Sequence, residues 1–149
     1  ADPARLAKSY AREGREAPVW AMDFRPSGAL SATPRDLAML VIACLRRGVA
    51  ADGSRFLSPA SIARMERGET SAAARAGVRE GSYGLGNFGF EIDGRIFRGH
   101  WGETEGFLTT LGYLPEAGRG FVLMINTADG ATMQALRRIA GAYLARDLA

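Results

Sequence analysis

The stretch that decides the fold is residues 85–127, LGNFGFEIDGRIFRGHWGETEGFLTTLGYLPEAGRGFVLMINT. It contains two pairs of strand-like segments, each pair joined by a connection of hairpin length. The first pair flanks Asp93-Gly94, a dipeptide typical of a two-residue β-turn. Because such short connections join antiparallel neighbours, the stretch predicts an antiparallel sheet of about four strands. The predicted strands are residues 85–92, 95–100, 107–114 and 120–127.

A helix is predicted before this stretch, over residues 34–47. Thr33 is a good N-cap, Asp36 follows three residues later, and Gly48 ends the pattern. Cys44 lies on the apolar side of this helix, and we interpret it as a small buried hydrophobe rather than a reactive thiol. The predicted inner stripe consists of Leu37, Leu40, Val41, Cys44 and Leu45.

Two further helices complete the predicted architecture. A short one begins at Pro59 with Ser58 as its cap, and a longer one runs from about Ala131 to Asp147. Helices before and after an antiparallel sheet predict an α+β fold in which helices flank the sheet. The inner stripe of the last helix is predicted to be Met133, Leu136, Ala140, Tyr143 and Leu144.

The 149 residues are interpreted as a single domain with two less regular segments. Residues 1–32 are expected to be a lead-in, with a short helical turn around 5–12 and a strand or packed loop over 20–24. Residues 66–82 are rich in Gly, Ala, Ser, Arg and Glu, and we expect a flexible connection there, with a helical turn near 72–76. Because the chain begins at Ala1 without a targeting pattern, we expect it to be either a processed fragment or an engineered portion of a longer protein.

The composition argues against several classes of protein. With 47% hydrophobic and 23% charged residues, the chain has an ordinary globular balance. The net charge of +3 comes from scattered arginines, with Lys8 as the only lysine, which argues against a nucleic-acid partner. The longest apolar run, residues 37–45, is too short to cross a membrane. One cysteine and one histidine, Cys44 and His100, exclude an intrachain disulfide and argue against a zinc site, so we expect neither metal nor cofactor.

Residues 84–89 spell G-x-G-x-x-G, a pattern associated with dinucleotide binding. That function requires the glycines to close a strand and open a helix, whose N-terminus holds the pyrophosphate. Here the pattern lies within strand-like sequence and a hairpin turn follows it. We therefore expect these glycines to permit close backbone packing or a bulge.

The segment most suggestive of chemistry is Gly99-His100-Trp101-Gly102-Glu103-Thr104-Glu105-Gly106-Phe107. Three glycines around one histidine and one tryptophan indicate a backbone that approaches another group closely. A glycine-rich β-bulge with a packed tryptophan would explain the same residues. Local chemistry alone leaves both interpretations open.

This segment resembles the third motif of the serine β-lactamase and penicillin-binding protein superfamily, which also contains D-Ala-D-Ala peptidases and esterases. That motif is Lys-Thr/Ser-Gly in many members and His-x-Gly in others, and His100-Trp101-Gly102 would fill it. The resemblance covers roughly residues 24–145 and lies in several pieces that follow the family's order. The other pieces are residues 26–33, 36–38, 57–59, 83–86, 106–107, 115–116, Gly120 and 126–127.

The resemblance implies specific roles for the residues of this segment. Catalytic roles fall to His100, Gly102 and Glu103, with the Glu103 N–H as one oxyanion donor and His100 in place of the usual lysine. Substrate-binding roles fall to Trp101, which would shape the acyl pocket, and to Thr104. The substrate would be a small-molecule ester, amide or β-lactam. Because an imidazole changes its charge near neutral pH, we expect neutral or ester substrates to be favoured over β-lactams.

The sequence departs from the family in a way that matters for activity. The family's nucleophile is the serine of Ser-x-x-Lys, but Lys8 is the only lysine and Arg5 stands three residues before it. None of the four tyrosines begins the Tyr-x-Asn motif that supplies the base. We therefore expect this chain to be inactive alone, with a missing N-terminal segment of the same protein as its partner. The family habit implies a periplasmic or extracytoplasmic location.

An alternative class is a non-catalytic binding or sensor module that keeps this half of the fold. Such a module would dock a partner chain through the part of the sheet that the missing segment would cover. An exposed apolar patch or an unpaired strand edge would favour it.

Overall fold

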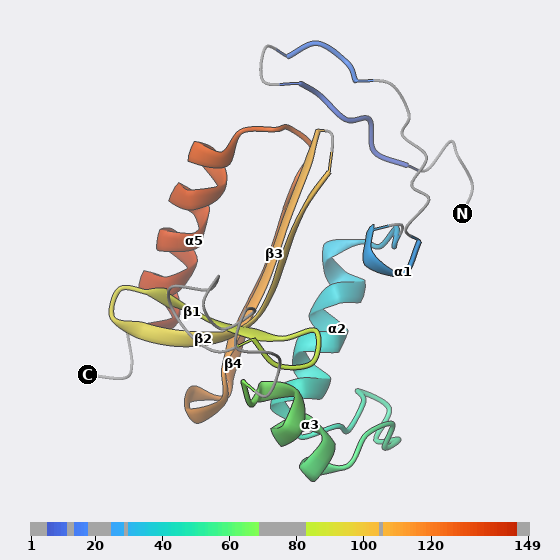
Figure 1. Ribbon diagram of the computed structural model, residues 1–149, viewed down its shortest axis with the longest axis vertical. Helices are drawn as coiled ribbons and strands as arrows, with labels where there is room; N and C mark the ends of the chain where they lie inside the picture. The colour runs from blue at the N-terminus through green and yellow to red at the C-terminus, as the bar shows by residue number, and fades with distance from the viewer. Residues whose placement is uncertain are drawn as a thin grey trace.

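The computed structural model describes residues 6–11, 14–17, 25–28, 30–68, 83–104 and 106–145. Its centre is a four-stranded antiparallel sheet in the order β1-β2-β3-β4, with helices packed around it (Figure 1). This arrangement confirms the predicted α+β class. The strands are β1 (Phe88–Ile92), β2 (Arg95–Thr104), β3 (Phe107–Leu114) and β4 (Arg119–Ile125). The helices are α1 (Arg25–Gly28), α2 (Pro34–Leu45), α3 (Pro59–Glu66) and α5 (Gly130–Ala145), with a short 3₁₀ turn, η2 (Pro115–Ala117).

Helices cover both faces of the sheet. Successive residues of β3 show this, because Tyr113 packs in the cluster with α2 and α3, whereas Leu114 packs in the cluster with α5. Figure 1 shows α5 on one side of β3 and α2 on the other. The α5 cluster contains Phe88, Phe90, Ile92, Phe97, Leu114 and Leu144, and the α2 cluster contains Val41, Cys44, Ile62 and Tyr113.

Local sequence explains the start of α2. The Thr33 side chain accepts a hydrogen bond from the Asp36 N–H (3.2 Å), and the Asp36 carboxylate accepts one from the Thr33 N–H (2.9 Å). This reciprocal capping box satisfies two N–H groups that the helix cannot. These hydrogen bonds hold the pKa of the Asp36 carboxyl below its usual value.

The buried side of α2 is narrower than the sequence predicts. Val41 and Cys44 are buried, as predicted, and burial raises the pKa of the Cys44 thiol. Leu40 was expected in the stripe but is exposed, because α3, β3 and β4 cover the side of α2 that carries Val41 and Cys44 and do not reach round to Leu40. In α5, Leu144 is buried whereas Tyr143, also predicted to face inward, is exposed; one residue turns a helix by about 100°.

The structure confirms the predicted hairpin between β1 and β2. Asp93 and Gly94 both have positive φ, 50° and 77°, as a type I′ turn requires. The strand bounds differ from prediction in three strands, and in β4 the difference is small, with Arg119–Ile125 in place of the predicted 120–127. β1 begins at Phe88 rather than at residue 85, because the Gly84 N–H donates to the Asn87 carbonyl (2.6 Å) and closes a turn. β2 continues past His100 to residue 104, because β3 pairs with it along that whole length.

The expected helical turn over residues 5–12 is wrong for the part that the structure describes. Tyr10 forms isolated bridges with Glu16 and with Thr127, and its N–H donates to the Asn126 carbonyl (3.0 Å). These residues therefore extend the sheet hydrogen bonding just beyond β4. The one-turn helix α1 was not predicted. The expectations for residues 20–24 and 72–76 lie outside the described residues, as does most of the connection expected at 66–82.

Candidate active site

The segment that resembles the third motif lies on an incompletely paired strand. The β1–β2 pairing ends at Phe88 opposite Gly99, whereas the β2–β3 pairing continues to Thr104 opposite Phe107. Among the described residues, positions 100–104 of β2 thus have a strand partner on one side only. We call residues 100–104 the open edge of β2.

The direction of the backbone N–H groups along this edge follows from a single hydrogen bond. The Gly99 N–H donates to Oδ1 of Asn87 (3.1 Å), so it points toward the β1 side of the strand. N–H groups alternate in direction along a strand, and the β2–β3 register is continuous through this region. The N–H groups of Trp101 and Glu103 therefore face the open edge, and that of Gly102 faces β3.

His100 is held at both ring nitrogens. Its Nδ1 lies 2.6 Å from the Trp101 carbonyl oxygen, and its Nε2 lies 3.0 Å from the Tyr83 hydroxyl. A carbonyl oxygen can only accept, so Nδ1 carries the proton and Nε2 of the neutral ring accepts from Tyr83. The ring also contacts Phe88 edge-on, with centroids 5.1 Å apart. His100 is therefore a half-buried group of defined orientation.

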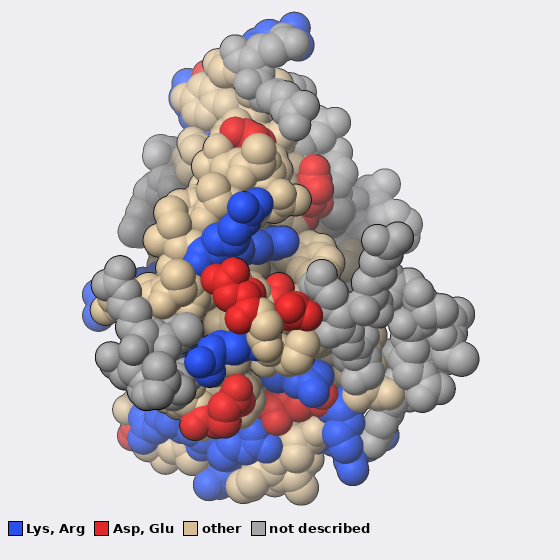
Figure 2. Space-filling view, turned by 90° about the vertical axis from the view of Figure 1, so that its left-hand side faces the viewer, with Lys and Arg blue, Asp and Glu red and all other residues tan. Residues whose placement is uncertain are grey.

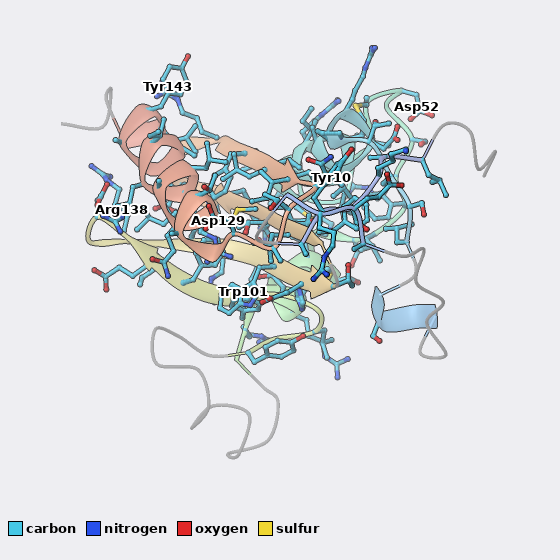
Figure 3. The ribbon with its side chains drawn as sticks, turned by 90° about the horizontal axis from the view of Figure 1, so that it is seen from above. Tyr10, Asp52, Trp101, Asp129, Arg138 and Tyr143 are labelled. Carbon is cyan, nitrogen blue, oxygen red and sulfur yellow. The ribbon has the colours of Figure 1, made fainter. Side chains whose placement is uncertain are left out.

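The Trp101 side chain projects from the face of the sheet opposite to that of His100. Its ring packs edge-on against Phe88 at 4.0 Å and lies beneath the Arg137 guanidinium of α5, 5.2 Å from the ring centroid. Arg137 also donates two hydrogen bonds to the Thr110 hydroxyl (2.9 and 2.7 Å). The indole is still 41% exposed, and Figure 3 shows it at the rim of the sheet, well separated from Tyr143 on α5.

The remaining predicted residues lie along the same edge. Gly102 and Glu103 are exposed and Thr104 is half-buried. A Cβ at Gly102 would have no atom within 4 Å, so the space beside this residue is open. Because glycine has no side chain, nothing from Gly102 fills that space. The structure thus places His100, Gly102, Glu103 and Thr104 on one strand edge, with the Trp101 side chain turned to the α5 face.

A chain of polar groups behind this edge was missed by sequence reasoning. Arg47 donates to both carboxylate oxygens of Glu66 (2.9 Å each), and the Tyr113 hydroxyl donates to Glu66 (3.2 Å). Nδ2 of Asn87 donates to the Tyr113 hydroxyl (2.7 Å), and Asn87 in turn accepts from Gly99. We call these five residues the polar chain. Burial raises the pKa of the Tyr113 phenol far above its usual range, so that it stays a neutral donor.

Close packing, predicted for the glycines of the G-x-G-x-x-G pattern, is found at Gly84 but not at Gly86, where a Cβ would meet no atom within 4 Å and φ is positive, 61°. A Cβ at Gly84 would stand 1.9 Å from the Met65 carbonyl oxygen, and the next residue, Leu85, donates its N–H to that same oxygen (3.2 Å). A Cβ at Gly99 would stand 2.1 Å from the Leu111 carbonyl oxygen. Neither Gly84 nor Gly99 has room for a side chain.

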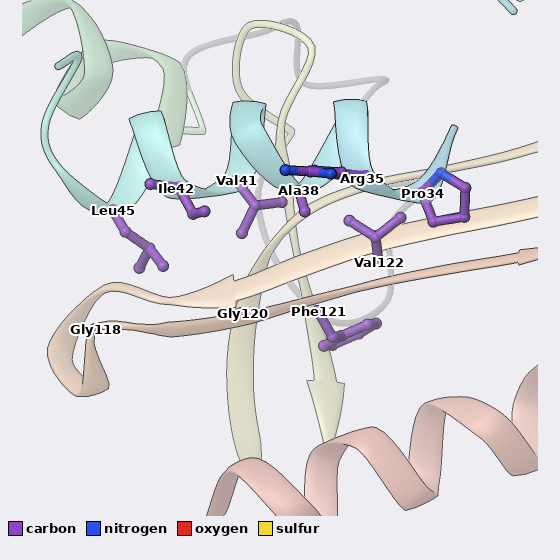
Figure 4. A pocket seen from close by; sticks show the side chains of 10 residues that line it. All are labelled: Pro34, Arg35, Ala38, Val41, Ile42, Leu45, Gly118, Gly120, Phe121 and Val122. Atoms are coloured by element: carbon purple, nitrogen blue, oxygen red, sulfur yellow. The ribbon is translucent and has the colours of Figure 1, made fainter. Parts of the chain in front are cut away.

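A groove of different character lies between α2 and β4 (Figure 4). It has a volume of about 480 Å³ and an almost wholly apolar lining, with Arg35 as its one charged lining residue. It lacks a histidine, serine, cysteine or carboxylate in its lining, so it offers apolar contact rather than catalysis. Its lining is Pro34, Arg35, Ala38, Val41, Ile42, Leu45, Gly118, Gly120, Phe121 and Val122.

Three further observations concern the described part of the chain as a whole. Figure 2 shows acidic and basic side chains intermixed on the face that it presents, rather than gathered by sign. Among the described residues, no three His, Cys, Asp or Glu side chains come together as a metal site would require. Nor does any described helix combine the length and the apolar character needed to cross a membrane.

The antiparallel sheet with helices on both faces, and a His-x-Gly strand exposed at one edge, define the class of domain. The family model described as Beta-lactamase matches residues 1–146. The chain therefore belongs to the β-lactamase family and has its serine-hydrolase-like fold. Comparison with curated proteins and with solved structures gave no match.

Proposed function

We propose that this chain forms the third-motif wall of a serine hydrolase active site and acts on a small-molecule ester, amide or β-lactam. The observation that carries the proposal is the open edge of β2, where the Glu103 N–H faces outward beside a fixed imidazole, His100. An N–H held in place by a strand stabilises negative charge on a carbonyl oxygen without reorganising. The Glu103 N–H is the proposed oxyanion donor.

The other residues of the edge take supporting roles in this proposal. His100 stands where many family members have a lysine, and the contact of its Nε2 with the Tyr83 hydroxyl holds the ring in place. Gly102 keeps the edge free of side-chain bulk, and Thr104 and Trp101 border the substrate. The nucleophile and its base must come from another segment, because the chain contains neither Ser-x-x-Lys nor Tyr-x-Asn.

The sharpest test removes the proposed donor alone. Glu103→Pro deletes the N–H, and proline is tolerated in an edge strand where that N–H faces away from the ladder. In a protein that joins this chain to a segment with Ser-x-x-Lys and Tyr-x-Asn, we expect kcat for p-nitrophenyl acetate to fall roughly 10²–10³-fold. Glu103→Ala, which keeps the N–H, is the matched control and should stay near the unmodified rate.

Equal rates for Glu103→Pro and Glu103→Ala would refute the oxyanion role. A second variant, Gly102→Pro, controls for loss of stability, because the Gly102 N–H faces β3 rather than the open edge. Gly102→Pro should lower the thermal midpoint by removing a ladder hydrogen bond, whereas Glu103→Pro should leave it nearly unchanged.

A preference for neutral esters over β-lactams is the finer part of the proposal. A β-lactam carboxylate favours a permanent cation, which a histidine side chain, unlike a lysine, does not supply. His100→Lys should therefore raise the ratio of benzylpenicillin to ester turnover in the joined protein. Rapid penicillin turnover that survives His100→Ala would contradict this preference.

A second candidate function, docking of a partner segment, is supported at the other edge of the sheet. β4 pairs only with β3 among the described residues, and its sequence from Phe121 to Ile125 is entirely apolar. The groove adjoins it, and Met39 and Ile42 of α2 are exposed nearby. An apolar strand edge beside an apolar groove suits strand addition, and the nucleophile-bearing segment is the proposed occupant.

Docking predicts that a charge in the groove weakens association. Ile42 lines the groove and is 39% exposed, so Ile42→Asp should be tolerated by the fold. We expect it to weaken binding of the separately produced N-terminal segment at least tenfold, measured by calorimetry. Ile139→Asp is the matched control, since Ile139 is 65% exposed on α5 and lies outside the groove. Equal weakening by both variants would reject the groove as the docking surface.

A further inference from the structure

The turn that precedes β1 touches the candidate site at two points. Tyr83, at its start, contacts the imidazole of His100, and Asn87, at its end, contacts the backbone of Gly99, the residue before His100. We propose that Tyr83 and Asn87 are the positioning residues of His100, one holding the orientation of its ring against the Trp101 carbonyl and the other holding the place of its backbone. A role of these two residues in catalysis rests on the proposed function, whereas their contacts with His100 and Gly99 do not depend on it.

The Trp101 carbonyl can only accept and therefore selects the Nδ1–H tautomer, and the Tyr83 contact holds the ring in the orientation that meets this carbonyl. With Nδ1–H donating to the Trp101 carbonyl, Nε2 has a lone pair that the Tyr83 O–H fills. The opposite tautomer would leave Nδ1 unprotonated, with its lone pair 2.6 Å from a carbonyl lone pair, which is repulsive. The Tyr83 ring further limits rotation, because it stacks on Phe88, which the His100 ring also contacts.

Asn87 holds the turn and the strand together with three hydrogen bonds. Its backbone carbonyl accepts from Gly84, its Oδ1 accepts from Gly99, and its Nδ2 donates to Tyr113. Asn87 is 3% exposed and Tyr113 is 1% exposed, so these bonds are shielded from water. The Gly84 bond fixes the position of the adjacent Tyr83, and the Gly99 bond fixes the strand one residue before His100.

The Asn87 side chain contacts β2 where the β1–β2 pairing ends. The last strand pair is Phe88 with Gly99, and Oδ1 of Asn87 accepts from the Gly99 N–H at this end of the pairing. Asn87 therefore holds β2 at the boundary between its paired part and its open edge.

The single histidine makes the test direct. In the 149-residue chain with ¹⁵N-labelled histidine, two-bond ¹H–¹⁵N correlations report the tautomer of His100 alone. At about pH 8.5, where an ordinary imidazole is neutral, we expect the Nδ1–H form to dominate. Tyr83→Phe releases the ring from its orientation and weakens the Nδ1–H contact with the Trp101 carbonyl. It should therefore raise the ratio of Nε2–H to Nδ1–H about fivefold, the change expected for loss of one ordinary hydrogen bond.

The controls separate positioning from general destabilisation. Tyr143→Phe removes a hydroxyl from an exposed tyrosine on α5 and should leave the tautomer ratio unchanged. Asn87→Ala should raise the ratio in the same direction and accelerate amide exchange at Gly99 about tenfold. If Asn87→Ala does not fold, Tyr113→Phe tests the same link, because it removes the oxygen that accepts from Asn87.

An unchanged ratio in Tyr83→Phe would overturn the role of Tyr83. Unchanged Gly99 exchange in Asn87→Ala, or in Tyr113→Phe where that variant replaces it, would overturn the role of Asn87. Because the readout needs no turnover, it is independent of the proposed function. The tautomer result can hold while the Glu103→Pro test fails, and the reverse can also occur.

Discussion

The two open edges of the sheet differ in what supports them. The open edge of β2 presents backbone N–H groups and a histidine, and the polar chain from Arg47 to Gly99 lies behind it. The edge at β4 presents apolar side chains and has the groove and α2 beside it. The difference teaches that directional hydrogen bonds hold the backbone and the histidine of the β2 edge in defined positions. The β4 edge instead offers an apolar surface, which a partner can contact without such fixed positions.

The largest expected effect is at the start of the β2 edge. Gly99→Ala places a Cβ against the backbone of Leu111, which cannot move without breaking the β2–β3 pairing. We expect the free energy of unfolding to fall by about 3 kcal/mol or more, measured by urea titration. Gly102→Ala on the same strand meets nothing within 4 Å and should change it by less than about 0.5 kcal/mol. An equal loss of unfolding free energy in Gly99→Ala and Gly102→Ala would show that the close contact of Gly99 with Leu111 is not what limits substitution there.

An intermediate effect is expected inside the polar chain. Tyr113→Phe removes the hydroxyl that joins Asn87 to Glu66 and leaves buried polar atoms unpaired. We expect a loss of roughly 1–3 kcal/mol in unfolding free energy. The control, Tyr143→Phe, makes the same substitution at a tyrosine that is 67% exposed on α5 and should lower the unfolding free energy less. A silent Tyr113→Phe would mean that the β2 edge does not depend on the polar chain.

The smallest expected effect concerns α2, which lies beside the β4 edge. The depressed pKa of Asp36 means that the unfolded chain binds its proton more readily than the folded one. The capping contribution is therefore present above the ordinary carboxyl pKa and is lost as pH falls through the lowered folded-state value. Asp36→Asn should lower the thermal midpoint slightly at neutral pH. It should also make the midpoint fall less steeply as the pH is lowered, as thermal melts at several pH values would measure. If the midpoint of Asp36→Asn falls with decreasing pH as steeply as that of the unmodified protein, residues other than Asp36 cause the acid sensitivity.

Local signals predicted most of the fold. The cap at Thr33, the start of α3 at Pro59, the Asp93-Gly94 turn and strand β3 are as predicted, because each depends on residues close in sequence. The errors share one cause. Leu40 and Tyr143 have the right hydrophobicity for a core, but whether a neighbour covers them is a property of the assembled domain.

The candidate site divides in the same way. The sequence by itself determined the family, the His100-Trp101-Gly102 motif, and the absence of a Ser-x-x-Lys nucleophile from the chain, since these depend on residue identity and order. Only the tertiary structure decided that His100 meets Tyr83, that Trp101 turns to the α5 face, and where the β1–β2 ladder ends. The polar chain joins Arg47, Glu66, Asn87, Gly99 and Tyr113 across distant parts of the sequence. Directional contacts of this kind form only when folding brings such residues within hydrogen-bond distance, so no local pattern could have predicted them.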